Sequence, residues 1–124
     1  MKSISKNQKY INQLEGTDLL IDTTEEKGGT GQYTRPHDLL EAALASCINI
    51  MLQKEAEKLE LKDIQFETEV VLNRENPEEA HFEYSYKIIA NDNYENLREM
   101  FDEALLNSSV RKTLSRRIVF TKKE

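Results

Sequence analysis

The strongest constraint on the fold is a long apolar stretch within residues 34–59. Its apolar part runs from Leu39 to Leu52 and contains only three strongly polar residues, Glu41, Ser46 and Asn49. A helix that is apolar nearly all round must be covered nearly all round. The stretch is too short for a membrane span, which needs about 18 to 20 such residues. We therefore predict a long, buried core helix, and Cys47, the only cysteine, lies near its centre.

Length, charge and cysteine content exclude several classes of partner. With 124 residues, the chain is predicted to be a single domain, residues 1–124. The net charge of -6 argues against a nucleic-acid partner, because no basic patch is available to neutralise phosphates. The first residues lack the apolar segment of a secretory signal, and one cysteine gives no disulfide framework. We therefore expect a cytoplasmic protein with neither a nucleic-acid nor a membrane partner.

Metal and cofactor sites are not predicted. Cys47, His37 and His81 stand at unrelated spacings, whereas a zinc site needs three or four convergent ligands. Neither of the common glycine-rich nucleotide-binding motifs occurs in the chain. We therefore expect no metal and no cofactor.

The segment before the long helix predicts short strands and a loop. Residues 1–15 are polar with scattered apolar positions, which is compatible with a weak strand or edge ribbon. Residues 18–22 form a short apolar run between polar flanks and predict a strand. Residues 25–34 hold three of the four glycines and predict a loop with an unusual backbone conformation.

The segment after the long helix predicts a hairpin followed by helices. Residues 63–73 and 80–90 alternate strictly between apolar and polar positions, which is typical of two antiparallel strands with one buried face. A capping-box pattern opens residues 92–105, whose apolar positions repeat every three or four residues and predict an amphipathic helix. A short helix over 110–116 and a final strand over 118–120 complete the prediction.

This order of elements predicts an α+β fold with an antiparallel sheet. One sheet covers only one side of the long helix, and the second amphipathic helix is too short to cover the rest. A second copy of the chain is the economical way to bury what remains, so we predict a homodimer.

Two motifs together resemble those of the OsmC/Ohr family of peroxide-reducing proteins. The first comprises Gly28-Gly-Thr-Gly31, Arg35-Pro36-x-Asp38-Leu39-Leu40 and Ala42-Ala-Leu-Ala-Ser-Cys47. The second, Asn107-Ser-Ser-Val-Arg-Lys-Thr-Leu114, is similar to the Cys-Pro-Val-x-x-Thr-Leu segment of that family. The predicted order of strands and helices also fits over almost the whole chain.

The resemblance implies an OsmC-like α+β fold in which an intertwined homodimer buries the two long helices at its centre. In active members of the family, the first cysteine attacks an organic hydroperoxide and becomes a sulfenic acid, which a second cysteine resolves as a disulfide. An arginine and a glutamate hold the first thiolate and position the peroxide. Cys47 stands at the position of the first cysteine.

The chain departs from the family pattern at the partners of that cysteine. Ser108 replaces the resolving cysteine and cannot form the disulfide. We expect it to cap a helix and, if the geometry of the family's cysteine pair persists, to keep a hydrogen bond towards Cys47. His37 stands near the position of the glutamate, and Asp38 matches the looser form of the motif. Arg35 is the available substitute for the family's arginine, which has no counterpart earlier in the chain. The candidate catalytic residues are therefore Cys47, Arg35, His37, Asp38 and Ser108.

Two functions follow from these residues, because Cys47 is either a reactive thiol or a small core residue. In the first, Cys47 reduces an organic hydroperoxide and an external thiol reductant clears the sulfenic acid, which makes the protein a one-cysteine thiol peroxidase. In the second, the chain is a catalytically inactive OsmC-like dimer that binds a small apolar or acyl ligand at the dimer interface.

Overall fold

The computed structural model describes residues 1–123 and forms two compact units, 1–41 and 42–124. The boundary between the units lies within the long helix α1, Pro36–Lys58. This helix confirms the sequence prediction for residues 34–59 to within two residues at each end. None of the helices among residues 1–123 has the length and apolarity required to cross a membrane.

The first unit is a small antiparallel sheet. Its strands are β1 (Ser3–Ser5), β2 (Asn12–Leu14) and β3 (Leu20–Ile21), paired in the order β1-β2-β3. Ile11 and Ile21 are buried in it. The predicted strands are confirmed but are shorter than their sequence ranges. Within the predicted loop lies one turn of 3-10 helix, η1 (Glu25–Lys27), which ends where Gly28 takes a left-handed conformation with φ 94°.

A buried carboxylate fixes the loop that follows β3. Asp22 is only 2% exposed, and its carboxylate accepts hydrogen bonds from the backbone N–H of Thr23, at 2.7 Å, and of Thr30, at 3.1 Å. The hydroxyl of Thr30 donates a further bond to it. Gly29 lies so close to the Thr23 carbonyl that a Cβ would overlap with it. The glycines of this loop therefore permit a tight wrap around Asp22.

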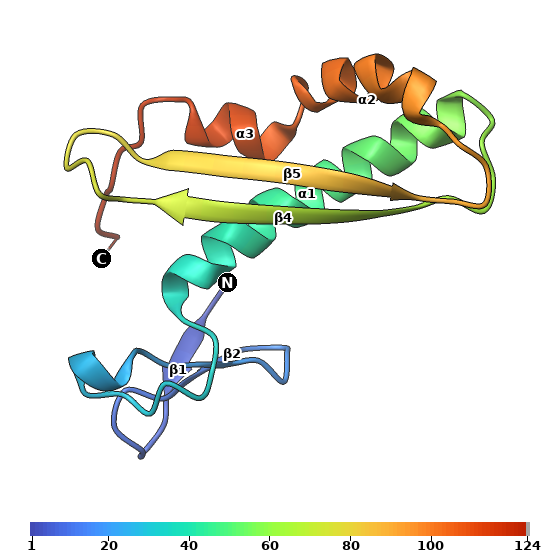
Figure 1. Cartoon of the computed structure of the whole chain (residues 1–124). Helices are drawn as coiled ribbons and strands as arrows, with labels where there is room; N and C mark the ends of the chain where they lie inside the picture. The colour runs from blue at the N-terminus through green and yellow to red at the C-terminus, as the bar shows by residue number, and fades with distance from the viewer. Residues whose placement is uncertain (124) are drawn as a thin grey trace. The chain divides into compact units, whose positions relative to one another are not determined.

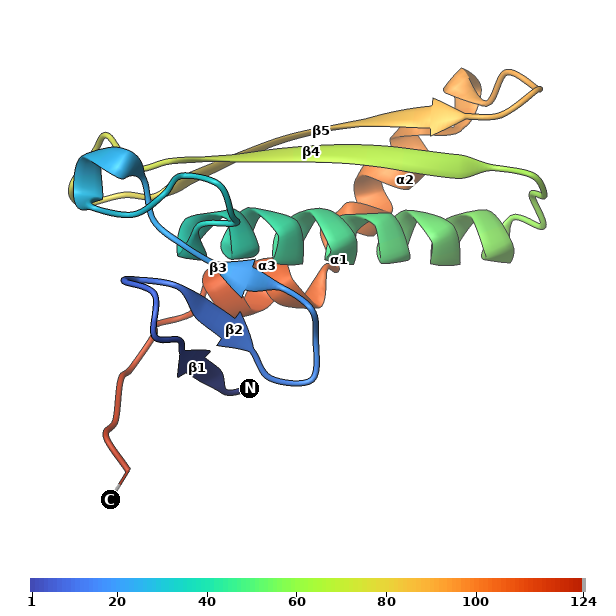
Figure 2. The same cartoon turned by 90° about the horizontal axis from the view of Figure 1, so that it is seen from below.

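The second unit contains the predicted hairpin and the helices that pack on it. Strands β4 (Gln65–Asn73) and β5 (His81–Ile89) are antiparallel, with Phe66 opposite Ile88 and Val70 opposite Tyr84. In Figures 1 and 2 the hairpin lies along the part of α1 after residue 41, and the helices near the C-terminus pack beside it. Together with the antiparallel sheet of the first unit, this confirms the predicted α+β class.

One face of α1 forms the core of the second unit. Leu44, Ile48, Leu52 and Ala56 are four residues apart and therefore share a face, and all are buried. They pack against residues from both strands and from the following helix, namely Val70, Tyr86, Phe101 and Leu105. The opposite face remains open within one chain: Ile50 is 50% exposed, and the small residues Ala42, Ala43 and Ser46 are exposed. The helix is thus buried on one side, whereas its sequence predicts burial all round.

The helix predicted over 92–105 begins later than expected. A 3-10 turn, η2 (Glu95–Leu97), precedes the α-helix α2 (Arg98–Leu105). The side chain of Asn93 accepts the backbone N–H of Glu95, and Glu95 forms an ion pair with Arg98. These contacts engage Glu95, the last residue of the expected capping box, in the tighter first turn.

The predicted short helix is present as α3 (Ser109–Leu114), but the predicted final strand is wrong. Residues 117–123 have no regular secondary structure, and Phe120 is 92% exposed. A strand needs a neighbouring edge to accept its backbone hydrogen bonds, and no strand edge among residues 1–123 pairs with this segment. The apolar run at 118–120 therefore has the composition of a strand but no pairing partner among residues 1–123.

Candidate active site

The candidate site lies in the second unit, where Cys47 meets the start of α3. Cys47 is half-buried on α1, and its Sγ lies 3.0 Å from Ser108 Oγ. A second hydroxyl, Ser109 Oγ, lies 3.7 Å from the same sulfur. The structure therefore brings together residues that are 61 positions apart in the chain. Ser108 keeps the contact with Cys47 that the resemblance leads one to expect of a resolving cysteine.

Ser108 is held in place because it caps α3. Its Oγ accepts the backbone N–H of Arg111 at 3.4 Å, and its side chain is almost fully buried. A hydroxyl carries one donor and two acceptor positions, so Ser108 can accept from Arg111 and still donate to Cys47. A thiolate can only accept, which fixes Ser108 as the donor whenever Cys47 is ionised. Both roles expected of Ser108, helix cap and hydrogen-bond partner of the thiol, occur together.

These contacts determine the ionisation of the thiol. Partial burial raises the pKa of Cys47, but the hydrogen bond from Ser108, together with the backbone N–H of Val110 and both the side chain and backbone of Ser109, lowers it. Together these effects lower the pKa of Cys47 below that of an ordinary thiol. The donors that lower the pKa come from the first turn of a helix, where unpaired N–H groups favour negative charge. The arrangement suits a nucleophilic thiol.

The remaining predicted residues lie in the first unit. Arg35 forms an ion pair with Asp38 at 2.7 Å, and the Asp38 carboxylate also accepts the Arg35 backbone N–H at 2.9 Å. The hydrogen bond from the Arg35 side chain is the largest cause of the lowered pKa of Asp38. His37 is half-buried in the first turn of α1. The structure therefore joins Arg35 with Asp38 and, separately, Cys47 with Ser108.

Sequence reasoning missed two residues of this site, Ser109 and Arg111. Ser109 supplies a second hydroxyl and a backbone donor to Cys47. Arg111 holds Ser108 through its backbone N–H. The available signal was their spacing: an N-cap serine bonds the N–H two or three residues on, so Ser108 points to Arg111.

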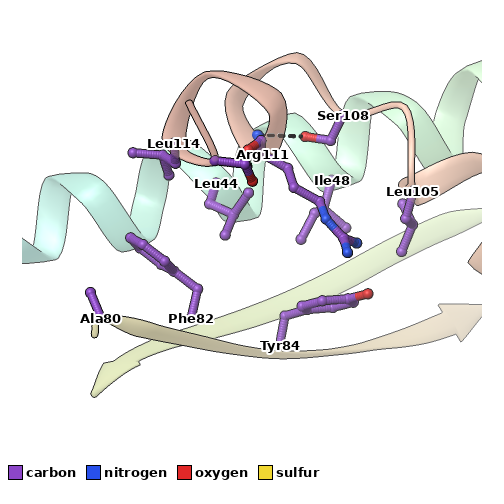
Figure 3. Close-up of a pocket in the computed structure, with 10 residues that line it drawn as sticks. Leu44, Ile48, Ala80, Phe82, Tyr84, Leu105, Ser108, Arg111 and Leu114 are labelled. Atoms are coloured by element: carbon purple, nitrogen blue, oxygen red, sulfur yellow. Dashed lines mark hydrogen bonds between the residues drawn. The ribbon is translucent and has the colours of Figure 1, made fainter. Parts of the chain in front are cut away.

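A pocket of about 450 Å³ lies beside these residues, between α1, β5 and α3, as Figure 3 shows. Ser108 belongs to both the pocket wall and the contact with Cys47. The pocket is lined by Leu44, Ile48, Ala80, Phe82, Tyr84, Leu105, Ser108, Arg111, Leu114 and Ser115. Within residues 1–123 no cluster of three or more metal-ligating side chains occurs.

Comparison with known proteins identifies the family and the fold. A family model described as OsmC-like protein matches residues 29–123, which is more than half of the chain. Comparison with curated proteins finds no match.

Three solved structures share the fold at low sequence identity. One, from Psychrobacter arcticus 273-4, is named for an osmotic stress induced and detoxification response; it is 20% identical, with a TM-score of 0.63 over 91% of this chain and 87% of that one. A second is the organic hydroperoxide resistance protein OsmC from Legionella pneumophila, at 15% identity and a TM-score of 0.60, covering 93% and 90%. The third, from Vibrio cholerae, is named for organic hydroperoxide resistance and holds captopril in one of its active sites; it is 14% identical, with a TM-score of 0.58 over 93% and 85%.

Proposed function

The chain belongs to the OsmC-like protein family, and on that premise we propose that it is a one-cysteine thiol peroxidase that reduces organic hydroperoxides. The observation that carries the proposal is the contact between Cys47 Sγ and Ser108 Oγ at 3.0 Å, together with the lowered pKa of the thiol. The Legionella and Vibrio structures, both named for organic hydroperoxide resistance, support the substrate class.

The first half of the cycle oxidises the sulfur. The Cys47 thiolate attacks the terminal oxygen of the hydroperoxide, so that an S–O bond forms while the O–O bond breaks. The leaving alkoxide takes a proton from water and departs as an alcohol. Cys47 is left as a sulfenic acid. Ser108 contributes by donating its hydrogen bond to the sulfur, which favours the thiolate before attack.

The second half of the cycle needs a thiol from outside the chain. Cys47 is the only cysteine, and Ser108, its neighbour, cannot form a disulfide. An external thiol attacks the sulfenic sulfur, forming a mixed disulfide and releasing water. A second external thiol then releases the Cys47 thiolate and leaves as a disulfide. A reducing cytoplasm, which we propose as the location, supplies such thiols.

We also propose that the protein works as a homodimer. The face of α1 opposite the core carries small exposed residues and Ile50, which is 50% exposed. Small residues allow another backbone to approach closely, and burial of this face would meet the all-round apolarity of the helix. Light scattering at micromolar concentration is expected to give twice the chain mass; a stable monomer would refute the dimer.

The test of the peroxidase is turnover together with trapping of the intermediate. The reduced protein is mixed with cumene hydroperoxide and dithiothreitol, and hydroperoxide loss is followed. In a parallel sample dimedone replaces the reductant, and the adduct is mapped by mass spectrometry. We expect catalytic loss of hydroperoxide and a dimedone adduct on Cys47, both absent from Cys47→Ser. Neither loss nor adduct in the wild type would reject the peroxidase and leave the catalytically inactive ligand-binding protein as the better account.

A further inference from the structure

We propose that the pocket between α1, β5 and α3 binds an amphiphilic carboxylate, with its hydrocarbon chain against the apolar walls and its head group on Arg111. This pocket adjoins the peroxidase site proposed above and shares Ser108 with it, but Cys47 is not among the residues that line it. The ligand would be bound intact, without a covalent step.

The walls of the pocket suit a hydrocarbon chain. Leu44 and Ile48 line it from α1 and Leu105 from α2, and all three are at most 5% exposed. Phe82 from β5 and Leu114 from α3 complete the apolar lining. The volume of about 450 Å³ lies within the range of roughly 300–1,000 Å³ that is typical of small-molecule sites.

Arg111 supplies the single positive charge of this lining. Figure 3 shows its side chain extending from α3 across the pocket towards Tyr84. Arg35 and Arg98 each form an ion pair with a carboxylate at 2.7 Å. Arg111, in contrast, forms no ion pair with any of residues 1–123. A guanidinium at an apolar wall selects a planar anion that it can bind with two hydrogen bonds.

The remaining polar side chains of the pocket carry hydroxyls, and they are Ser108, Ser115 and Tyr84. The lining therefore contains no carboxylate that would attract a cation or compete for Arg111. An apolar chamber with one cation and no carboxylate matches a fatty-acid-like molecule better than a neutral alcohol or an alkylammonium ion.

The first experiment compares three head groups on the same chain. Isothermal titration calorimetry measures binding of decanoate, decanol and decyltrimethylammonium to the full chain under reducing conditions, below micellar concentrations. We expect decanoate to bind about tenfold more tightly than decanol, because a charged hydrogen-bonded pair is added, and decyltrimethylammonium to bind least. From octanoate to decanoate, affinity should rise about three- to fourfold for each methylene. Equal affinity for decanoate and decanol would overturn the proposal.

The second experiment assigns the head group to Arg111. Arg111→Leu keeps the bulk and removes the charge, so decanoate should bind about tenfold more weakly while decanol is unchanged. Arg111→Lys keeps a point charge, and its affinity for decanoate should lie between those of the wild type and Arg111→Leu. Arg116→Leu is the matched control, because Arg116 is exposed and does not line the pocket, and it should bind decanoate like the wild type. Wild-type decanoate affinity in Arg111→Leu would contradict the assignment.

A third variant separates this proposal from the peroxidase. Cys47→Ser should retain decanoate binding, since Cys47 is outside the lining. Loss of turnover with retained binding supports both proposals. Turnover without decanoate binding in the wild type would refute the carboxylate site alone.

Discussion

The two units each contain an ionisable group facing a hydroxyl, and the two arrangements differ in what surrounds the pair. In the first unit the Asp22 carboxylate is 2% exposed and accepts bonds from the Thr30 hydroxyl and from two backbone N–H groups. In the second unit the Cys47 thiol is half-buried and meets the hydroxyls of Ser108 and Ser109. The hydrogen bonds lower the pKa of Asp22, as they do for Cys47.

The comparison shows that a hydrogen bond from a hydroxyl to an ionisable group can stabilise the fold in one place and support reactivity in another. Asp22 is sealed within its loop, so its bonds hold the chain together. Cys47 remains partly open, and its donors stabilise a charge without enclosing the sulfur. A lowered pKa marks a reactive group only where the atom that carries the charge can be reached.

The largest effect on stability is expected at Asp22. Asp22→Ala removes a buried acceptor and leaves its half-buried donors, the backbone N–H groups of Thr23 and Thr30 and the Thr30 hydroxyl, without this partner. The melting temperature should fall further than in any other variant discussed here, while Asp18→Ala, an exposed carboxylate in the same unit, should change it little. Thermal unfolding followed by circular dichroism measures both. Equal melting temperatures for the two variants would show that Asp22 does not hold its loop.

Replacement of the hydroxyl by a second sulfur should change the outcome of oxidation. Ser108 Oγ lies 3.0 Å from Cys47 Sγ, so Ser108→Cys should form an intramolecular disulfide after one equivalent of hydroperoxide. Intact mass after alkylation should show loss of both free thiols in this variant, whereas Ser115→Cys is the control for a second thiol without this contact. Persistence of two free thiols in Ser108→Cys would mean that the side chains do not meet in solution.

Loss of the Ser108 hydroxyl should have a moderate effect on both stability and reactivity. Ser108→Ala removes an N-cap, which costs about 0.5–2 kcal/mol of the free energy of unfolding. It also removes a donor to Cys47, so alkylation of the thiol by iodoacetamide at neutral pH should slow. Ser115→Ala, which lines the same pocket without touching the sulfur, should leave the alkylation rate unchanged. An unchanged rate in Ser108→Ala would show that its hydroxyl does not support the thiolate.

The smallest expected effects concern how stability depends on pH, which should differ between Cys47 and Asp22. The pKa of Cys47 is lower in the folded chain, so the thiol adds stability above its ordinary value of 9.0 and loses this contribution as pH falls through the folded pKa. The pKa of Asp22 is also lower in the folded chain, so its carboxylate adds stability above the ordinary value of 3.8 and loses this contribution as pH falls through the folded pKa. In urea unfolding, the free energy of unfolding of the wild type should therefore rise relative to that of Cys47→Ser as pH rises towards 9.0. Against Asp22→Asn, the wild type should lose its advantage as pH falls below 3.8. Parallel pH profiles would contradict these assignments.

Much of the fold could be predicted because local patterns and packing agree. The apolar stretch yields α1, and strict alternation yields β4 and β5. The predictions fail where the secondary structure depends on a contact that the local sequence pattern does not contain. The run at 118–120 has strand composition, but no strand edge in the described part of the chain pairs with it. The first turn of the helix predicted over 92–105 has a different geometry, in which Asn93 accepts the backbone N–H of Glu95.

The candidate site was predictable only in part. The motifs pointed to Cys47 and Ser108, and a helix cap explains why Ser108 is fixed beside the sulfur. Its sequence neighbours, by contrast, suggest that burial raises the pKa of Cys47. The compensating donors come from α3, about sixty residues later, and only the folded chain brings them to the sulfur. The cap spacing from Ser108 points to the backbone N–H of Arg111, but only the folded chain shows that its side chain lines the pocket.

The most direct test of the account is a titration of the Cys47 thiolate. Ultraviolet absorbance of the thiolate is followed against pH in the reduced wild type, in Ser108→Ala and, as a blank, in Cys47→Ser. The account predicts a midpoint below the ordinary thiol value of 9.0 in the wild type and a higher midpoint in Ser108→Ala. A wild-type midpoint at or above 9.0, or one that Ser108→Ala leaves unmoved, would contradict it.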